Sequence, residues 1–162
     1  MMIPAELASL LSMIGYDWPE GDEEKLFELG QVWMDFATTV EELGREANAL
    51  AAEVTADNRG DVIAAFEAYW SGADGPGGVL DGNGTATTVL GAGYVVVAAV
   101  VLALKVQMIV QLVILAIQIA QAVATAVATF GASLLEIPIF KMLTGLVIDQ
   151  LIDLAMQAVL GG

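Results

Sequence analysis

The fold is decided by residues 26–54, LFELGQVWMDFATTVEELGREANALAAEV, in which apolar side chains recur at alternating intervals of three and four positions. That spacing is a heptad seam, which places these side chains along one side of a single long helix. A helix over 22–56 is roughly 50 Å long at 1.5 Å per residue, longer than a compact globule of this size needs. The seam consists of Leu26, Leu29, Trp33, Phe36, Val40, Leu43, Ala47, Leu50 and Val54.

Small residues follow one flank of this seam at intervals of seven, at Gly30, Ala37, Gly44 and Ala51. A glycine inside a helix costs roughly 1 kcal/mol relative to alanine, so a packing reason is expected for Gly30 and Gly44. We predict that another helix approaches the small flank closely. The seam itself has two interpretations, an intramolecular core or a coiled coil that faces a partner.

Apolar periodicity and its interruptions predict the rest of the chain as further helices joined by short breaks. The stretch 71–84 contains six glycines and one proline, a composition typical of a mobile loop. The predicted helices lie at about 4–14, 22–56, 60–71, 86–130 and 137–160. We therefore predict an all-α fold, an elongated helical bundle built on long antiparallel helical hairpins, in which 1–84 and 85–162 form one structural unit.

Charge divides the chain into an acidic half and an apolar half. Residues 1–84 hold 17 acidic and three basic side chains, whereas residues 85–162 hold three acidic and two basic ones. The net charge of −15 repels phosphate backbones and anionic lipid headgroups, which argues against nucleic acid and against simple electrostatic docking to membranes.

Reactive side chains are scarce. The chain has no cysteine and no histidine, which excludes disulfides, thiolate nucleophiles, Cys/His metal sites and histidine acid–base catalysis. The acidic pairs on the predicted helices are interpreted as solvated faces. We therefore predict that the protein is not an enzyme and needs no cofactor or metal. The first 15 residues lack a basic region before their apolar residues, so no cleavable signal peptide is predicted.

The apolar half is long enough to raise a membrane interpretation. Residues 86–130 carry one charge, Lys105, and the windows 86–104 and 106–128 could each cross a bilayer. Lys105 has no turn residues around it, and no excess of Lys or Arg orients an insertion, so we expect a soluble bundle. The alternative is a membrane-inserting or pore-forming translocation element built from residues 86–160. A polar stripe on the helix consists of Gln107, Gln111, Gln118 and Gln121.

Tyr69-Trp70-Ser71-Gly72 ends a predicted helix before the glycine-rich stretch, which is a W-x-G motif. Together with Trp18-Pro19-Glu20-Gly21 and the apolar run from Gly82 to Ser133, it resembles the WXG-like N-terminal domain of actinobacterial polymorphic toxins secreted by type VII (Esx) systems. The sequence is similar to the leader domains of mycobacterial outer-membrane channel proteins that carry a necrotizing toxin. The resemblance covers most of the chain.

The resemblance implies a non-catalytic leader that binds partners and takes a larger toxin to the cell envelope or the medium. Trp70 and Gly72, with Tyr69, take the positions of the export motif, although Trp70 also fits a plain core aromatic. The Tyr-x-x-x-Asp/Glu signal that follows such hairpins is absent after Tyr69 and Tyr94. We therefore expect a small WXG-type helical hairpin protein to supply it, and we expect a toxin domain beyond Gly162. The apolar half further predicts self-association or a bound helical partner, and membrane contact stays open.

Overall fold

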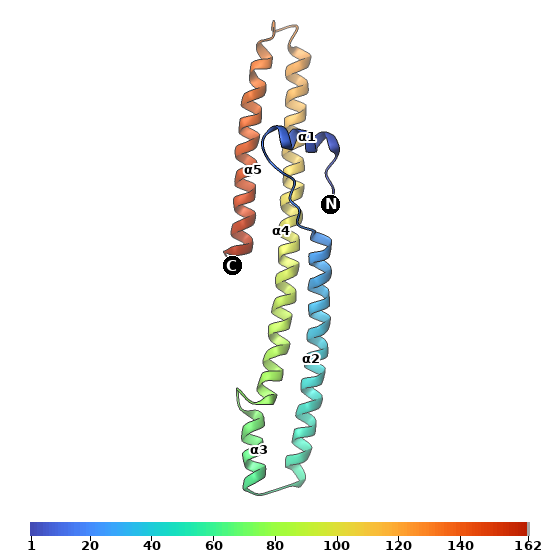
Figure 1. Ribbon diagram of the computed structural model, residues 1–162, viewed down its shortest axis with the longest axis vertical. Helices are drawn as coiled ribbons and strands as arrows, with labels where there is room; N and C mark the ends of the chain where they lie inside the picture. The colour runs from blue at the N-terminus through green and yellow to red at the C-terminus, as the bar shows by residue number, and fades with distance from the viewer. Residues whose placement is uncertain (162) are drawn as a thin grey trace. The chain divides into compact units, whose positions relative to one another are not determined.

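The computed structural model describes residues 1–161, and every regular element in that range is helical (Figure 1). The prediction of an all-helical fold based on long antiparallel helices is confirmed, because α2 packs antiparallel to α3 and α4. The elements are α1 (Ala5–Met13), α2 (Glu23–Asp57), α3 (Asp61–Ser71), α4 (Pro76–Thr125), the 3₁₀ helix η1 (Ala132–Glu136) and α5 (Ile137–Leu160).

The chain forms two compact units, and their division differs from the boundary expected after residue 84. One unit is Glu24–Val96; the other combines Met1–Glu23 with the residues from Val97 onward. The difference arises because α4 is one continuous helix through the expected boundary, so packing partners rather than a loop define the units. We call these the α2 unit and the α5 unit.

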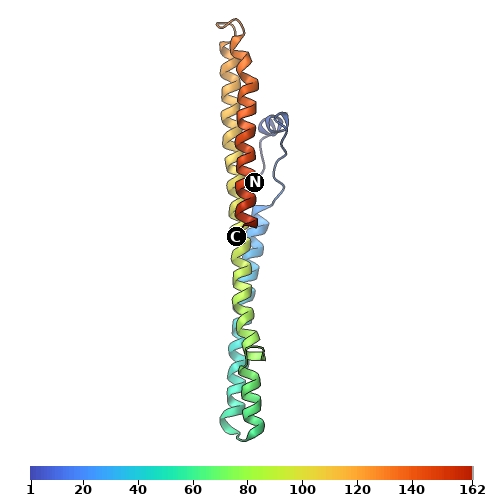
Figure 2. The ribbon, with the colours of Figure 1, turned by 90° about the vertical axis from the view of Figure 1, so that its left-hand side faces the viewer.

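In the α2 unit, α2 runs beside α3 and the first part of α4 (Figures 1 and 2). The glycine-rich stretch 71–84 is not the mobile loop that its composition predicts, since α4 begins at Pro76, ten residues earlier than expected. Proline suits the first turn of a helix because its missing N–H is not needed there. Several of these glycines pack closely against neighbouring segments; a Cβ added at Gly84 would lie 2.8 Å from Glu41 Cγ, whereas one at Gly82 would meet nothing within 4 Å.

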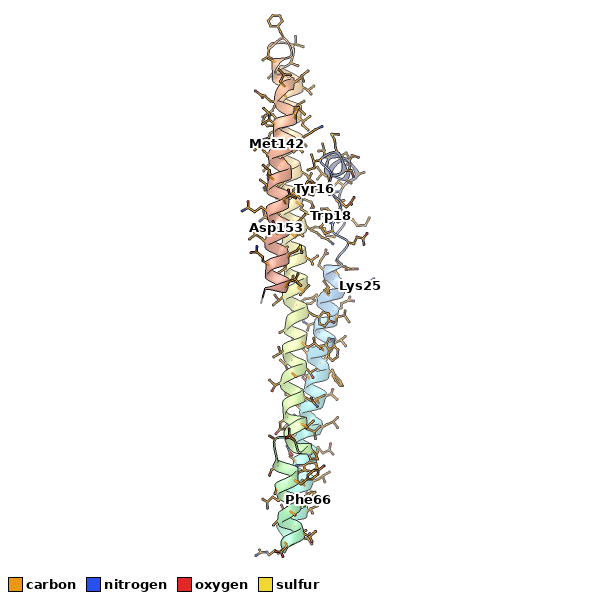
Figure 3. All side chains as sticks on the ribbon, turned by 60° about the vertical axis from the view of Figure 1, so that its left-hand side comes forward. Tyr16, Trp18, Lys25, Phe66, Met142 and Asp153 are labelled. Carbon is orange, nitrogen blue, oxygen red and sulfur yellow. The ribbon has the colours of Figure 1, made fainter. Side chains whose placement is uncertain are left out.

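In the α5 unit, the last part of α4 and α5 form an antiparallel hairpin that α1 crosses (Figure 1). A small core joins the three helices through Leu11, Met108, Leu112 and Ile148, all nearly inaccessible to solvent. The segment after α1 also lies against this hairpin: the Tyr16 hydroxyl donates a hydrogen bond to the Gly145 carbonyl oxygen at 3.0 Å. Figure 3 shows Tyr16 and Trp18 directed from this segment toward the helices.

The hairpin turn follows Thr125, five residues before the helix end expected at residue 130. The chain reverses where Phe130 and Gly131 adopt positive φ angles of 52° and 85°. The Ser133 hydroxyl fastens the turn by donating to the Ala122 carbonyl oxygen at 2.7 Å. Glycine at 131 is the break that the sequence indicates, but the helix unwinds one turn earlier.

Most apolar surface is not covered within the chain. Among residues 1–161, only eight apolar side chains are buried, while large apolar side chains on every long helix are exposed. Two helical stretches, Asp61–Thr125 and Ala132–Leu160, are long and apolar enough to cross a membrane by length and composition. Only 22% and 17% of their most apolar windows are buried, whereas the core helix of a soluble protein is mostly buried.

Candidate functional site

The small flank of α2 is where α2 and α4 approach each other within the α2 unit. Gly30 and Gly91 are both buried, and a Cβ added at Gly30 would lie 2.9 Å from the Gly91 carbonyl oxygen and 2.8 Å from Val95 Cγ2. A Cβ added at Gly91 would lie 2.7 Å from Met34 Cγ. Backbone cannot move aside as a flexible side chain can, so the crossing requires glycine at both positions.

Gly44 lies on the same flank but under less constraint. It is buried, yet a Cβ added there would lie 3.6 Å from Leu80 Cβ, which is ordinary van der Waals contact. Ala37, between the two glycines, is 2% exposed and already carries a Cβ. The two helices are therefore closest at Gly30 and more widely spaced toward Gly44.

Contact on the small flank divides the heptad seam into an inner and an outer row. The inner row, next to the small flank, is half-buried against the neighbouring helices and consists of Leu26, Trp33, Val40 and Ala47. The outer row is 45–57% exposed and consists of Leu29, Phe36, Leu43 and Leu50. The sequence left two interpretations of the seam, intramolecular core or partner-facing coiled coil; the inner row packs within the chain, and the outer row is exposed.

The W-x-G motif closes the turn between α3 and α4. The Trp70 indole N–H donates a hydrogen bond to Asn48 Oδ1 on α2 at 2.7 Å, and the Phe66 ring lies 6.0 Å from the Trp70 ring. The Asn48 amide in turn donates to Asp81 Oδ1 on α4 at 3.4 Å. Through Asn48, Trp70 therefore links α3 to α2 and α4, and it has a structural role in the α2 unit.

The turn that follows is too tight for side chains. A Cβ at Gly75 would overlap the Tyr69 carbonyl oxygen, and a Cβ at Gly77 would lie 2.8 Å from Trp70 Nε1. Gly72 has extended backbone and accepts a hydrogen bond from the Gly75 N–H at 2.8 Å. The glycine content of this stretch predicted mobility; in the structure, the glycines instead permit close packing around the tryptophan.

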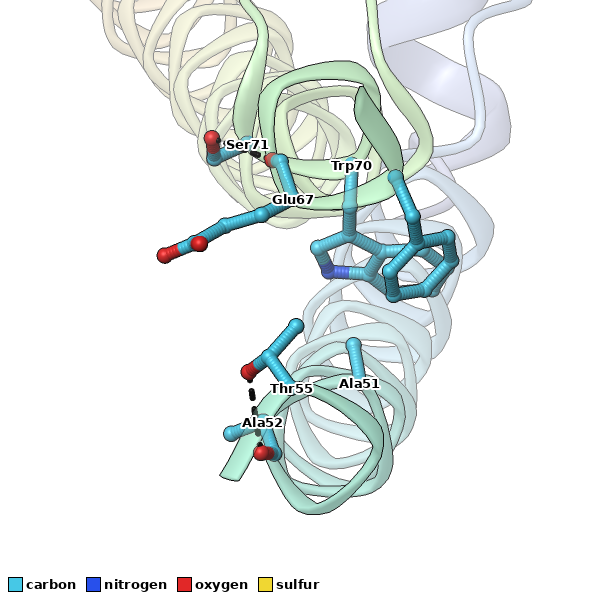
Figure 4. A pocket seen from close by; sticks show the side chains of 7 residues that line it. Ala51, Ala52, Thr55, Glu67, Trp70 and Ser71 are labelled. Carbon is cyan, nitrogen blue, oxygen red and sulfur yellow. Dashed lines mark hydrogen bonds between the residues drawn. The ribbon is translucent and has the colours of Figure 1, made fainter. Parts of the chain in front are cut away.

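Two features of the motif remain accessible. Tyr69, next to the half-buried Trp70, is 67% exposed. A shallow pocket of about 160 Å³ opens beside Trp70 between α2 and α3 (Figure 4). It is large enough for one side chain of a partner, and it is lined by Ala51, Ala52, Thr55, Phe66, Glu67, Trp70 and Ser71.

The predicted polar stripe on α4 does not form one solvated edge. Gln107 and Gln121 are exposed, whereas Gln111 and Gln118 are half-buried. Gln107 lines a groove of about 200 Å³ with apolar residues of α5, among them Leu151 and Leu154. The stripe therefore follows the border of the contact between α4 and α5.

A buried ion-pair cluster that the sequence did not predict lies in the α5 unit. Lys105 is 3% exposed, and its ammonium contacts Glu23 Oε2 and the Gly21 carbonyl oxygen, each at 2.6 Å. The amino group of Met1 pairs with the other Glu23 oxygen. The Trp18 ring centroid lies 6.0 Å from the Lys105 ammonium. A single lysine in a long apolar stretch indicates that a counter-charge lies beside it. The sequence could not show that this counter-charge is Glu23, because the two residues are 82 positions apart.

The cluster changes the acidity of Glu23. The hydrogen bond from Lys105 and that from the terminal amino group lower the pKa of Glu23 from its ordinary 4.5 to about 2. The Lys105 ammonium and the Glu23 carboxylate need each other, because a buried charge without a counter-charge is strongly destabilising. The cluster fixes the segment before α2 against α4 but offers no reactive group: among residues 1–161, no three acidic side chains are grouped so as to hold a metal ion.

Comparison with known proteins agrees with this arrangement of helices and motif. No curated protein and no solved structure matches the chain. A family model described as a WXG100 like domain matches residues 2–145, which is most of the sequence. The match spans α1 to α4 and the first turns of α5, including Trp70 and Gly72 in the turn between α3 and α4. The chain therefore belongs to the WXG100-like domain family.

Proposed function

We propose that this chain is the non-catalytic leader and partner-binding domain that takes a larger polymorphic toxin to a type VII secretion system. WXG100-like domains are secretion-associated helical domains without catalytic function, which gives the coarser part of this role. We propose in addition that the domain carries a toxin, binds a partner, and reaches the cell envelope or the medium. The absence of histidine and cysteine supports a binding role, because it removes most catalytic chemistry.

The observation that carries the proposal is the outer row of α2. Leu29, Phe36, Leu43 and Leu50 repeat every seven residues and remain about half exposed, although α2 already packs on α4 through its small flank. A heptad-spaced apolar row is the surface that a second helix needs for knobs-into-holes packing. We assign the row to a small WXG-type helical hairpin protein, which would supply the Tyr-x-x-x-Asp/Glu signal.

The W-x-G turn has a second task in this proposal. Trp70 holds the turn through Asn48, while Tyr69 and the shallow pocket beside Trp70 stay open to a recognising protein. A rigid turn presents such a pocket at low entropic cost, since little ordering is required on binding. Partner binding and recognition for export would thus use different surfaces of the same unit.

The proposal is tested by following the full chain in a host with a functional type VII system and in the same host without its secretion ATPase. We expect the chain in the medium only when the ATPase is present. Capture assays with the small WXG-type proteins of that host test the outer row. Phe36→Glu with Leu43→Glu should abolish capture, and Trp70→Ala with Gly72→Ala should weaken both capture and export.

The controls separate misfolding from lost recognition. Gln31→Glu adds the same charge to an exposed position of α2 away from the outer row, and it should leave capture and export intact. Helical circular dichroism of each variant shows whether the α2 unit still folds. Secretion that is independent of the ATPase, or capture that survives the Phe36 and Leu43 substitutions, contradicts the proposal.

A further inference from the structure

The hairpin of the α5 unit ends in a turn that is uncharged and rich in exposed apolar side chains. No residue from Val106 to Leu135 carries a charge. At the turn, Val127, Phe130 and Leu135 are 89%, 99% and 75% exposed. Phe130 also has φ 52°, a left-handed conformation that bulky residues rarely adopt. A strained aromatic held wholly outside the protein has no packing role within the chain, so its role is in contact with something else.

The apolar surface of the tip surrounds the hairpin rather than forming one face. On α4, Val110, Val113 and Ile117 are 41–53% exposed on the side opposite the buried residues Met108 and Leu112. On α5, the side opposite the buried Ile148 carries exposed apolar residues over the first three turns, namely Ile139, Met142 and Leu146. A single helical partner covers one face of a two-helix hairpin and would leave the other face and the turn uncovered.

The same side of α5 changes from apolar to polar along the helix. Beyond Leu146 it carries Asp149, Gln150, Asp153 and Gln157, all exposed. Figure 3 shows the change: Met142 lies nearer the turn and Asp153 further from it. The ten residues 137–146 extend roughly 15 Å at 1.5 Å per residue, and η1 adds about 10 Å at 2.0 Å per residue. The sum of about 25 Å is shorter than a hydrocarbon core of roughly 30 Å.

The charge of the protein determines which kind of lipid membrane the hairpin tip can approach. The part of the α5 unit from Val97 onward has two basic and three acidic side chains, so it is nearly neutral, whereas the whole chain carries −15. An anionic membrane repels the chain, and a zwitterionic membrane does not. One acidic side chain, Glu136, is exposed close to the turn, and Lys141 contacts Met13 Sδ of α1 at 2.8 Å.

We propose that the hairpin tip, residues 113–147, inserts into a zwitterionic lipid bilayer from one side without crossing it, with Asp149 and Asp153 marking the depth at which insertion stops. This goes beyond the role in secretion, and it differs from a transmembrane helix because α5 becomes polar halfway along its exposed side. Glu136 and Lys141 both lie within the tip and oppose insertion, since charged side chains are costly in hydrocarbon.

The test uses the full chain and phosphatidylcholine vesicles. We expect the protein to float with these vesicles, and to float less when phosphatidylglycerol is added. Val127→Asp with Phe130→Asp should lower the partition coefficient at least about tenfold, because two exposed apolar anchors are lost and two charges gained. Val62→Asp, at an 81% exposed position of α3, is the matched control and should change little. Glu136→Gln should strengthen partitioning, whereas Glu20→Gln should not.

Depth is measured with single cysteines, since the chain has none of its own. An environment-sensitive dye on Ala128→Cys or Met142→Cys should report an apolar surrounding when vesicles are added, and on Asp153→Cys it should remain in water. The proposal is overturned if wild-type protein does not float, or if the tip dyes respond without vesicles, which indicates a protein partner or a second copy. A response at Asp153→Cys equal to that at the tip also overturns it, because the hairpin would then span the bilayer.

Discussion

The Lys105 ammonium and the Glu23 carboxylate form a buried ion pair at 2.6 Å that fixes the segment before α2 to the middle of α4. Lys105 is the only charged residue of α4 after Asp81, and a buried lysine without a counter-charge would be strongly destabilising. The pair makes the α5 unit depend on a group from the acidic end of the chain. The ion pair with Glu23 therefore explains how Lys105 can be buried in the apolar half of the chain.

This pairing predicts a pH-dependent contribution to stability. The pKa of Glu23 is about 2 in the folded protein and is ordinarily 4.5. A lowered folded pKa means that the stabilisation is complete above pH about 4.5 and is lost as the pH falls toward 2. Melting followed by circular dichroism should therefore show Glu23→Gln less stable than wild type at pH 7. The difference should shrink between pH 4.5 and 2.

The matched control for this experiment is Glu24→Gln. Glu24 is the exposed neighbour of Glu23 in α2, so the substitution removes one charge without breaking the buried pair. Its melting temperature should stay near that of the wild type across the same pH range. An equal pH-dependent loss in both variants would show that the overall acidic charge, rather than the pair, causes the effect.

Gly30 and Gly44 give opposite predictions although the sequence treats them alike. Gly30→Ala places a Cβ 2.9 Å from the Gly91 carbonyl oxygen, so α2 and α4 must separate, at a cost of about 1–3 kcal/mol in the free energy of unfolding. Gly44→Ala meets only Leu80 Cβ at 3.6 Å and should gain about 0.5–1 kcal/mol from helix propensity. Urea denaturation of the two variants measures the contrast. Equal effects would mean that the close crossing at Gly30 is not a determinant of the fold.

The sequence determined more about the helices than about how they pair. The heptad spacing of residues 26–54 predicted α2 to within a residue at each end. The small flank at Gly30 predicted a closely packed neighbour, but its spacing could not show which helix that neighbour is; the structure places α4 there. For the glycines near Gly77, composition indicated a loop, whereas packing against Trp70 makes the stretch helical. Propensity is a local quantity, and a tertiary contact overrode it.

Trp70 and Gly72 stand out in the sequence as a W-x-G motif, and the structure places Trp70 in the last turn of α3 and Gly72 just after that helix. Asn48, the hydrogen-bond partner of Trp70, was missed because a single asparagine within a seam carries no pattern. Glu23 was missed for the same reason among 20 acidic residues.

Asn48 provides a direct test of the structural role of the motif. Asn48→Ala leaves the half-buried Trp70 indole N–H without its acceptor and should cost about 1 kcal/mol in unfolding free energy. In a Trp70→Phe background, which lacks the donor, the same substitution should cost clearly less, because only the longer Asn48–Asp81 hydrogen bond is then lost. Denaturant titration of the four proteins in this cycle measures the coupling. Asn83→Ala, an exposed asparagine of α4, is the control; independent, additive losses would mean that the hydrogen bond contributes nothing.

The outer row of α2 predicts how the chain behaves without a partner. Phe36 and Leu43 are 50% and 55% exposed, and an apolar row of this spacing associates with itself when no other helix covers it. Light scattering after size exclusion should therefore show oligomers of the wild type. Phe36→Glu with Leu43→Glu should lower the mass because two charges would face each other across the contact, while helicity stays unchanged because neither side chain is buried. Gln31→Glu should associate as the wild type does. A wild type that remains monomeric at high concentration contradicts the assignment of this row to helix pairing.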